Sequence, residues 1–247
     1  MTILEAVEIS KHFGGLMAND HVSFRVEEGK ITSIIGPNGA GKTTLFNLLT
    51  GMYKPDAGKV LFDGRDITGW PIHRIVNQGI VRSFQVLNIF NEISPAENIR
   101  LAVQSRKKRS FNFFRPASAF DDINRETNAV LEEIGLTDVK DLPTKTLSYG
   151  DKRVLEIGIA MASEPRLLLM DEPTSGLPTS ETERIKKFIK KISSQLTVLV
   201  IEHDMDIVLT ISDTIIVLHQ GRVIAQGPPA EIKANDEVQT AYLGGID

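Results

Sequence analysis

A glycine-rich loop near residue 40 has the residue types and spacing of a phosphate-binding site. Its glycines allow the backbone to turn successive N–H groups toward an anion, and a helix behind the loop would add the positive end of its dipole. Lys42 would then reach the β- and γ-phosphates of a nucleoside triphosphate, and the Thr43 hydroxyl would complete the shell of a Mg²⁺ ion. The loop consists of Gly36, Pro37, Asn38, Gly39, Ala40, Gly41, Lys42, Thr43 and Thr44.

A second group of reactive side chains ends an apolar run. Residues 167–170 are continuously apolar and are followed directly by Asp171 and Glu172. Asp171 is expected to hold Mg²⁺ through water, and Glu172 to orient or deprotonate the attacking water. Two acids that merely end a strand are common, but a phosphate loop in the same chain favours the catalytic interpretation.

A third motif, residues 147–151, precedes apolar positions at helical spacing. Ser148 is expected to cap the start of this helix, and Gly150 to permit close approach of the backbone to an anion. On its own the motif indicates only a capped helix. It becomes specific beside the phosphate loop and the paired carboxylates.

The elements that must position these motifs can be predicted from periodicity. Strand-like residues 31–35 precede the loop and helix-like residues 45–49 follow it, which is the context in which such a loop binds phosphate. Apolar runs 167–170, 197–201 and 214–218 predict buried parallel strands. Alternation in the first thirty residues, together with residues 59–62, predicts a small antiparallel sheet. We therefore predict an α/β phosphate-loop NTPase: residues 1–85 and 165–247 form the core with its β subdomain, and residues 86–164 a helical subdomain.

Composition limits the remaining possibilities. The chain has 247 residues, 41% hydrophobic content, a formal charge of −4 and no cysteine. These values suit a globular protein, exclude disulfides and cysteine metal sites, and give no general electrostatic basis for binding nucleic acid. No secretory signal and no apolar run of about 20 residues is present, so a cytoplasmic protein is the simplest expectation. The basic and aromatic residues 105–116 indicate either a nucleic-acid or membrane contact or, the interpretation we favour, a solvated loop.

Taken together, the motifs resemble the nucleotide-binding subunit of ATP-binding-cassette (ABC) transporters over essentially the whole chain. Residues 36–43 look like the Walker A motif of this family, residues 167–171 like Walker B, and residues 147–151 like the signature. Gln85 falls at the position of the family's Q-loop, His203 at its switch histidine, and Phe13 where an aromatic ring stacks on adenine. These three assignments rest on the order and spacing of the three residues relative to the other motifs.

This resemblance implies a mechanism with ATP and Mg²⁺. Two such domains would pair head to tail, with each ATP between the phosphate loop of one chain and Ser148 and Gly150 of the other. Gln85 would sense Mg²⁺ and the attacking water, and His203 would contact the γ-phosphate. Membrane permease subunits at the cytoplasmic face of the membrane would contact the helical subdomain, and a substrate-binding protein would take part indirectly.

Finer similarities are to the ATPases of branched-chain amino-acid importers, notably at residues 79–85, 155–158 and 241–244. Importers of urea, amides or aromatic acids share much of this pattern, and a soluble non-transport cassette ATPase is a further alternative. Pro178 departs from the family, which usually has Asp or Asn there, because proline offers no side-chain acceptor across the dimer. Homodimer and heterodimer therefore both stay open.

Overall fold

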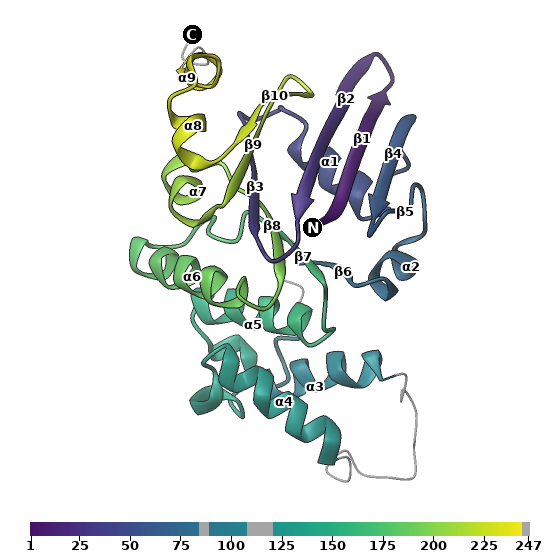
Figure 1. Cartoon of the computed structure of the whole chain (residues 1–247). Coiled ribbons are helices and arrows are strands. Elements are labelled where there is room, and N and C mark those ends of the chain that lie inside the picture. The colour runs from purple at the N-terminus through teal and green to yellow at the C-terminus, as the bar shows by residue number, and fades with distance from the viewer. Residues whose placement is uncertain (84–88, 108–120, 244–247) are drawn as a thin grey trace.

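The central sheet carries the strands that lead into the predicted motifs (Figure 1). In the computed structural model, which describes residues 1–83, 89–107 and 121–243, its strands lie in the order β10-β9-β3-β8-β7-β6. All neighbouring pairs are parallel except β9 and β10 at one edge, which are antiparallel. The strands are β3 (Ile31–Ile35), β6 (Ile80–Arg82), β7 (Leu167–Asp171), β8 (Thr197–Ile201), β9 (Thr214–His219) and β10 (Arg222–Gly227).

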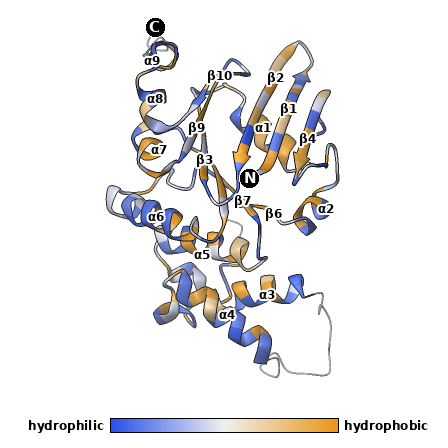
Figure 2. Ribbon diagram, viewed as in Figure 1, coloured by the Kyte–Doolittle hydropathy of each residue, from blue (hydrophilic) through white to orange (hydrophobic). Residues whose placement is uncertain are grey.

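The predicted buried parallel strands are confirmed. Every residue of β3, β7 and β8 is buried. Continuous apolar runs are required here because helices cover both faces of the sheet, so neither face of a strand meets water. Figure 2 shows this as hydrophobic colouring along the central strands, whereas α4 and α6 carry long hydrophilic stretches.

The predicted antiparallel sheet is also confirmed, with strand order β2-β1-β4-β5. Along β2 the apolar Val22, Phe24 and Val26 are buried, while Ser23 and Arg25 between them are exposed. This alternation places one face of the sheet against the core and the other in water. The strands are β1 (Thr2–Phe13), β2 (Leu16–Glu27), β4 (Ala57–Phe62) and β5 (Arg65–Asp66).

Helix α1 (Lys42–Leu49) follows the phosphate loop and packs between the two sheets (Figure 1). Its apolar residues Leu45, Phe46, Leu48 and Leu49 are buried in a cluster with residues of both sheets. The loop is therefore held between a buried strand and a buried helix. Helix α2 (Ile72–Asn77) lies between the antiparallel sheet and β6 in the chain.

A helical region covers the other face of the central sheet and extends away from the antiparallel sheet (Figure 1). Helix α6 buries residues at positions 185, 188, 189 and 192, which is the spacing of one helix face. The elements are α3 (Pro95–Arg106), α4 (Asp121–Glu133), the 3₁₀ turns η2 (Thr137–Val139) and η3 (Thr144–Thr146), α5 (Tyr149–Met161) and α6 (Thr179–Ile192).

Three C-terminal helices pack at the end of the central sheet that contains β9 and β10. Val208, Ile232 and Val238, one from each helix, are buried against β3 and β9. The helices are α7 (Met205–Ile211), α8 (Pro229–Lys233) and α9 (Asp236–Leu243). None of the helices in the described ranges combines the length and apolarity that crossing a bilayer requires.

Candidate active site

The carboxyl edge of the central sheet brings several predicted motifs together. β3 lies beside β8, and β8 lies beside β7, with Ile201 in register with both Ile34 and Asp171. The phosphate loop leaves β3, Glu202 and His203 leave β8, and the paired carboxylates end β7 at this same edge. Ligands bind at this edge in open parallel sheets. Gln85, which follows β6, lies outside the described residues.

Glycines in the phosphate loop are required by close backbone contacts. A Cβ on Gly36 would lie 2.0 Å from the carbonyl oxygen of Leu218, and one on Gly41 would lie 2.3 Å from that of Ala18. Gly41 also has φ 97° as the N-cap residue of α1. A side chain at either position would displace the loop, so the glycine spacing follows from the packing of the loop against its neighbours.

Lys42 is buried under the loop and points back along it. Its Nζ donates to the carbonyl oxygens of Gly36 at 2.6 Å and Pro37 at 3.1 Å. Burial lowers the pKa of Lys42, and the negative charges of Glu172 and Asp171 oppose that shift. Lys42 is therefore electrostatically coupled to the two carboxylates that end β7. A phosphate bound in the loop would provide an acceptor in place of the backbone carbonyls.

Asp171 is buried and is ion-paired in a way that the sequence analysis did not predict. Arg82, at the end of β6, donates through Nη2 to Asp171 Oδ2 at 2.5 Å. The same guanidinium donates through Nη1 to Asn47 Oδ1 in α1 at 2.6 Å. The arginine is visible in the sequence beside Gln85, but only the β6–β7 pairing places it against Asp171.

The oxygen ligands that the protein offers suit a Mg²⁺ ion that binds together with a nucleotide, rather than a metal ion held by protein side chains alone. The described residues contain no cluster of three or more His, Asp or Glu side chains able to hold a metal. They do offer the Asp171 carboxylate and the exposed Thr43 hydroxyl in the first turn of α1. Mg²⁺ commonly binds through one or two such oxygens together with substrate phosphates and water.

Glu172, the first residue of the turn that follows β7, has an unusual backbone conformation. Its φ is 48°, in the left-handed region, and its N–H donates to the carbonyl oxygen of Ile201 at 2.9 Å. Its own carbonyl oxygen accepts from Arg153 Nη2 at 2.8 Å and from the Ser175 N–H at 3.1 Å. Such backbone strain costs on the order of 1–3 kcal/mol and persists only where surrounding contacts hold it.

His203 lies at the surface beside a buried acid. Its side chain is 54% exposed, and Nδ1 lies 3.8 Å from Glu202 Oε2. Glu202 is fully buried, and its Oε1 accepts from the N–H and the hydroxyl of Thr174 at 3.1 and 2.6 Å. Burial raises the pKa of Glu202. A carboxylate after an apolar run, the signal used for Asp171, was equally present at Glu202 and was missed.

The predicted cap at Ser148 is confirmed. Its Oγ accepts from the Asp151 N–H at 3.0 Å and begins α5. Packing requires a glycine at position 150, which the sequence did not indicate, because a Cβ there would lie 1.9 Å from Glu181 Oε2. Its proposed contact with an anion stays a prediction.

Phe13 ends β1 with 43% of its surface exposed. Its ring packs edge-to-face against Tyr53, with centroids 5.4 Å apart, and Lys11 Nζ lies 5.7 Å from its centroid. An exposed aromatic ring held by a second ring is a suitable surface for stacking a base. The stacking itself stays a prediction.

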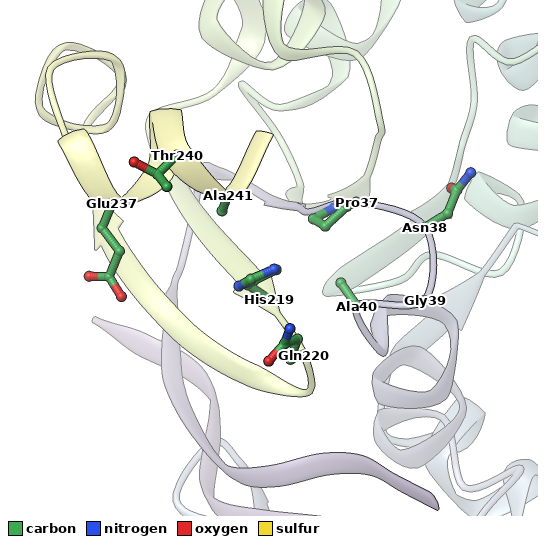
Figure 3. Close-up of a pocket in the computed structure, with 9 residues that line it drawn as sticks. All are labelled: Pro37, Asn38, Gly39, Ala40, His219, Gln220, Glu237, Thr240 and Ala241. Atoms are coloured by element: carbon green, nitrogen blue, oxygen red, sulfur yellow. The ribbon is translucent and has the colours of Figure 1, made fainter. Parts of the chain in front are cut away.

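The C-terminal helix α9 reaches the phosphate loop, which the sequence did not indicate. A pocket of ≈ 740 Å³ lies between the loop, the β9–β10 turn and α9 (Figure 3). Next to it, burial raises the pKa of the Tyr242 hydroxyl, with the Gly36 amide opposing the shift. The pocket is lined by Pro37, Asn38, Gly39, Ala40, His219, Gln220, Glu237, Thr240 and Ala241.

Comparison with protein families gives two matches. A family model described as "ABC transporter" matches residues 19–175. A second, described as "Branched-chain amino acid ATP-binding cassette transporter", matches residues 222–247. The first match contains the phosphate loop, the signature-like motif and the paired carboxylates, and the second covers β10 and the helices α8 and α9.

Individual relatives match over almost the whole chain. The high-affinity branched-chain amino acid transport ATP-binding protein BraF of Pseudomonas aeruginosa is 43% identical over 98% of both chains. The corresponding protein LivG of Escherichia coli K12 is 38% identical over 98% of both. A crystal structure of the ADP conformation of an ATP-binding cassette of an ABC transporter superimposes with a TM-score of 0.88, at 32% identity over 99% of both chains.

Proposed function

The chain belongs to the ABC transporter family of ATP-binding cassettes, and we propose that it powers an importer of branched-chain amino acids. It is an ATPase coupled to transport. The substrate class is supported by the names of the relatives and by the family model that matches the C-terminal residues. These findings favour branched-chain amino acids over the urea, amide and aromatic-acid importers, and over a non-transport cassette ATPase.

The observation that carries the proposed chemistry is the meeting of three chain segments at one sheet edge. The phosphate loop, the paired carboxylates and His203 follow the adjacent strands β3, β7 and β8. We assign the loop N–H groups and Lys42 to binding the phosphates. Glu172 would orient the attacking water and accept its proton, and His203 would donate to the γ-phosphate.

Residue roles toward a metal follow from the same arrangement. Thr43 and Asp171 would hold Mg²⁺, with Gln85 as the further oxygen ligand proposed from the sequence. When bound, the ion would neutralise charge on the β- and γ-phosphates. The charge of Asp171, which Arg82 balances in this structure, would then also face the ion. The Phe13 ring would stack on the adenine base.

A second cassette is part of the proposal. Ser148 is exposed at the start of α5, and neither it nor Gly150 lines the pocket beside the phosphate loop of its own chain. A head-to-tail pair would place this helix start, with its positive dipole end, against the nucleotide of the other chain. The partner is either a second copy or a related cassette, since Pro178 lacks the acceptor usual in this family.

The membrane partners are proposed from the transporter family. Permease subunits would contact the helical subdomain predicted over residues 86–164, and the chain would lie peripherally at the cytoplasmic face of the membrane. The substrate-binding protein of the importer would act on the permease rather than on this chain.

Uptake of radiolabelled leucine, isoleucine and valine tests the proposed substrate class. A strain lacking the chain should lose uptake of all three, and the wild-type gene, but not Lys42→Ala, should restore it. Purification of the tagged chain from membranes should recover permease subunits. Normal uptake of all three amino acids, with loss of urea or amide uptake, would contradict the assignment.

A further inference from the structure

We infer that Arg153 is a positioning residue for ATP hydrolysis, because it holds the backbone of Glu172 from helix α5. This inference rests on the proposed role of Glu172 in activating water. Arg153 lies far from solvent, with 1% of its surface exposed, and contacts the turn that follows β7.

The guanidinium bridges two consecutive carbonyl oxygens of that turn. Nη2 donates to Glu172 at 2.8 Å, and Nε donates to Pro173 at 3.1 Å. A third nitrogen, Nη1, donates to Glu156 Oε2 at 2.8 Å, and this carboxylate is itself buried in α5. The charge of Arg153 is therefore balanced within its own helix, while its planar fork is fixed to the backbone of the turn.

The backbone of Glu172 depends on contacts from two sides. Its N–H is bonded to Ile201 in the central sheet, and its carbonyl oxygen to Arg153 in α5 and to the Ser175 N–H of the turn. Its φ of 48° is uncommon for a residue with a side chain, and the following Pro173 restricts it further. Loss of the bond from α5 would allow the turn to relax toward a commoner conformation. Because rotation about φ swings Cβ, the carboxylate would then move from the position that it has at the sheet edge.

The next residue of the turn is held in a comparable way from the other side. Thr174 donates its N–H and its hydroxyl to Glu202, the buried acid that follows β8. The turn after Glu172 is thus fixed between a buried cation from α5 and a buried acid from the sheet. Arg153 is the member of this pair that contacts the backbone of Glu172 itself.

Arg153→Lys in the full-length chain tests the inference, because lysine keeps the positive charge but cannot bridge two carbonyls with a planar fork. We expect kcat to fall roughly tenfold or more, since small misplacements of a catalytic group cost this much. Nucleotide affinity, measured by calorimetry without turnover, should stay within about threefold, because the phosphate loop is unchanged. Arg25→Lys, in the pair with Glu5 on the antiparallel sheet, changes an exposed arginine in the same way, is the control and should retain the wild-type kcat.

The combination with Glu172→Gln separates positioning from general damage. If Arg153 acts through Glu172, adding Arg153→Lys to Glu172→Gln should reduce the residual hydrolysis by less than about twofold. If Arg153→Lys lowers the hydrolysis rate of Glu172→Gln by the same factor as that of the wild type, the inference is overturned. A kcat for Arg153→Lys equal to that of the control would overturn it too. Near wild-type hydrolysis by Glu172→Gln alone would instead refute the proposed role of Glu172.

A second variant covers the case in which Arg153→Lys does not fold. Arg153→Gln combined with Glu156→Gln removes both buried charges together and leaves neither unpaired. This pair should bind ATP and show the same fall in kcat. Retention of more than about half of the wild-type kcat by the folded pair would overturn the inference.

Discussion

Arg82 and Asp171 form an ion pair at the sheet edge, with Nη2 and Oδ2 2.5 Å apart and side-chain exposures of 9% and 2%. The pair joins β6 to β7, and the second bond of Arg82, to Asn47, extends it to α1. Asp171 is the carboxylate proposed to face Mg²⁺. In the structure its charge is balanced by an arginine whose strand leads toward residue 85.

Arg82→Met should destabilise the nucleotide-free chain by about 3–5 kcal/mol, because it leaves a buried carboxylate without its cation. Urea unfolding in EDTA measures this change. Addition of Mg-ATP should recover part of the loss, since a bound cation would again balance Asp171. Arg25→Met, at an exposed arginine paired with Glu5, should cost only about 0–1 kcal/mol. Equal effects of the two substitutions would contradict the structural importance of the buried pair.

Features carried by consecutive residues were predictable from the sequence. The apolar runs of β3, β7 and β8, and the glycine spacing of the loop, each lie within a few residues and gave the correct core. Arg82, Arg153 and Glu202 are different because their roles depend on partners far along the chain. Arg82 and Asp171 are 89 positions apart, and Thr174 and Glu202 are 28 positions apart.

The C-terminal helix and Gly150 show the same limit. Nothing in the sequence of α9 indicates that it lines a pocket beside the phosphate loop, since this arrangement arises from the return of the chain past β9 and β10. Gly150 was assigned to anion approach from its motif alone. Its contact with Glu181 appears only when α6 is packed on α5.

Lys42→Ala should weaken ATP binding at least tenfold, because Lys42 is the only side-chain cation in the loop and hydrogen bonds to charged groups contribute about 1.5–3 kcal/mol. Calorimetry with Mg-ATP measures the affinity. Lys59→Ala, at an exposed position in β4, removes the same charge and should bind ATP as the wild type does. Unchanged affinity in Lys42→Ala would reject the assignment of the loop.

Glu202 should make the stability of the fold depend on pH. Burial raises its pKa in the folded chain above the usual value of 4.5. The folded state therefore binds this proton more tightly, so the contribution to stability is present below the unfolded pKa and is lost as the pH rises through the folded pKa. Gln at this position keeps an oxygen for Thr174 and does not ionise. Glu202→Gln should consequently become more stable relative to the wild type as the pH rises from about 4 to about 8.

Urea midpoints across this pH range measure the difference between the two proteins. Glu132→Gln, at an exposed position in α4, is the control and should follow the wild type throughout. A difference between Glu202→Gln and the wild type that does not change with pH would show that Glu202 has no raised pKa.

Glu172→Gln should separate ATP binding from hydrolysis. The amide keeps the size and hydrogen-bonding capacity of the side chain but loses its basicity, so hydrolysis should fall by on the order of 10²-fold or more. ATP binding should survive, because Lys42, Thr43 and the loop N–H groups are unchanged. An ATP-bound dimer of cassettes could then not dissociate by hydrolysing its ATP, so this dimer should accumulate. Size-exclusion chromatography with Mg-ATP should show more dimer for the variant than for the wild type.

Pro178 determines which partner chains the chromatography of Glu172→Gln must include. It begins α6 without a side-chain cap and is exposed, so it presents no acceptor to a second chain. The chromatography should therefore be run with the chain alone and with the cassette that copurifies from membranes. Glu183→Gln, on the exposed part of α6, makes the same change of charge and should hydrolyse ATP and elute as the wild type does. Hydrolysis by Glu172→Gln at a near wild-type rate, in either mixture, would show that another group activates the water.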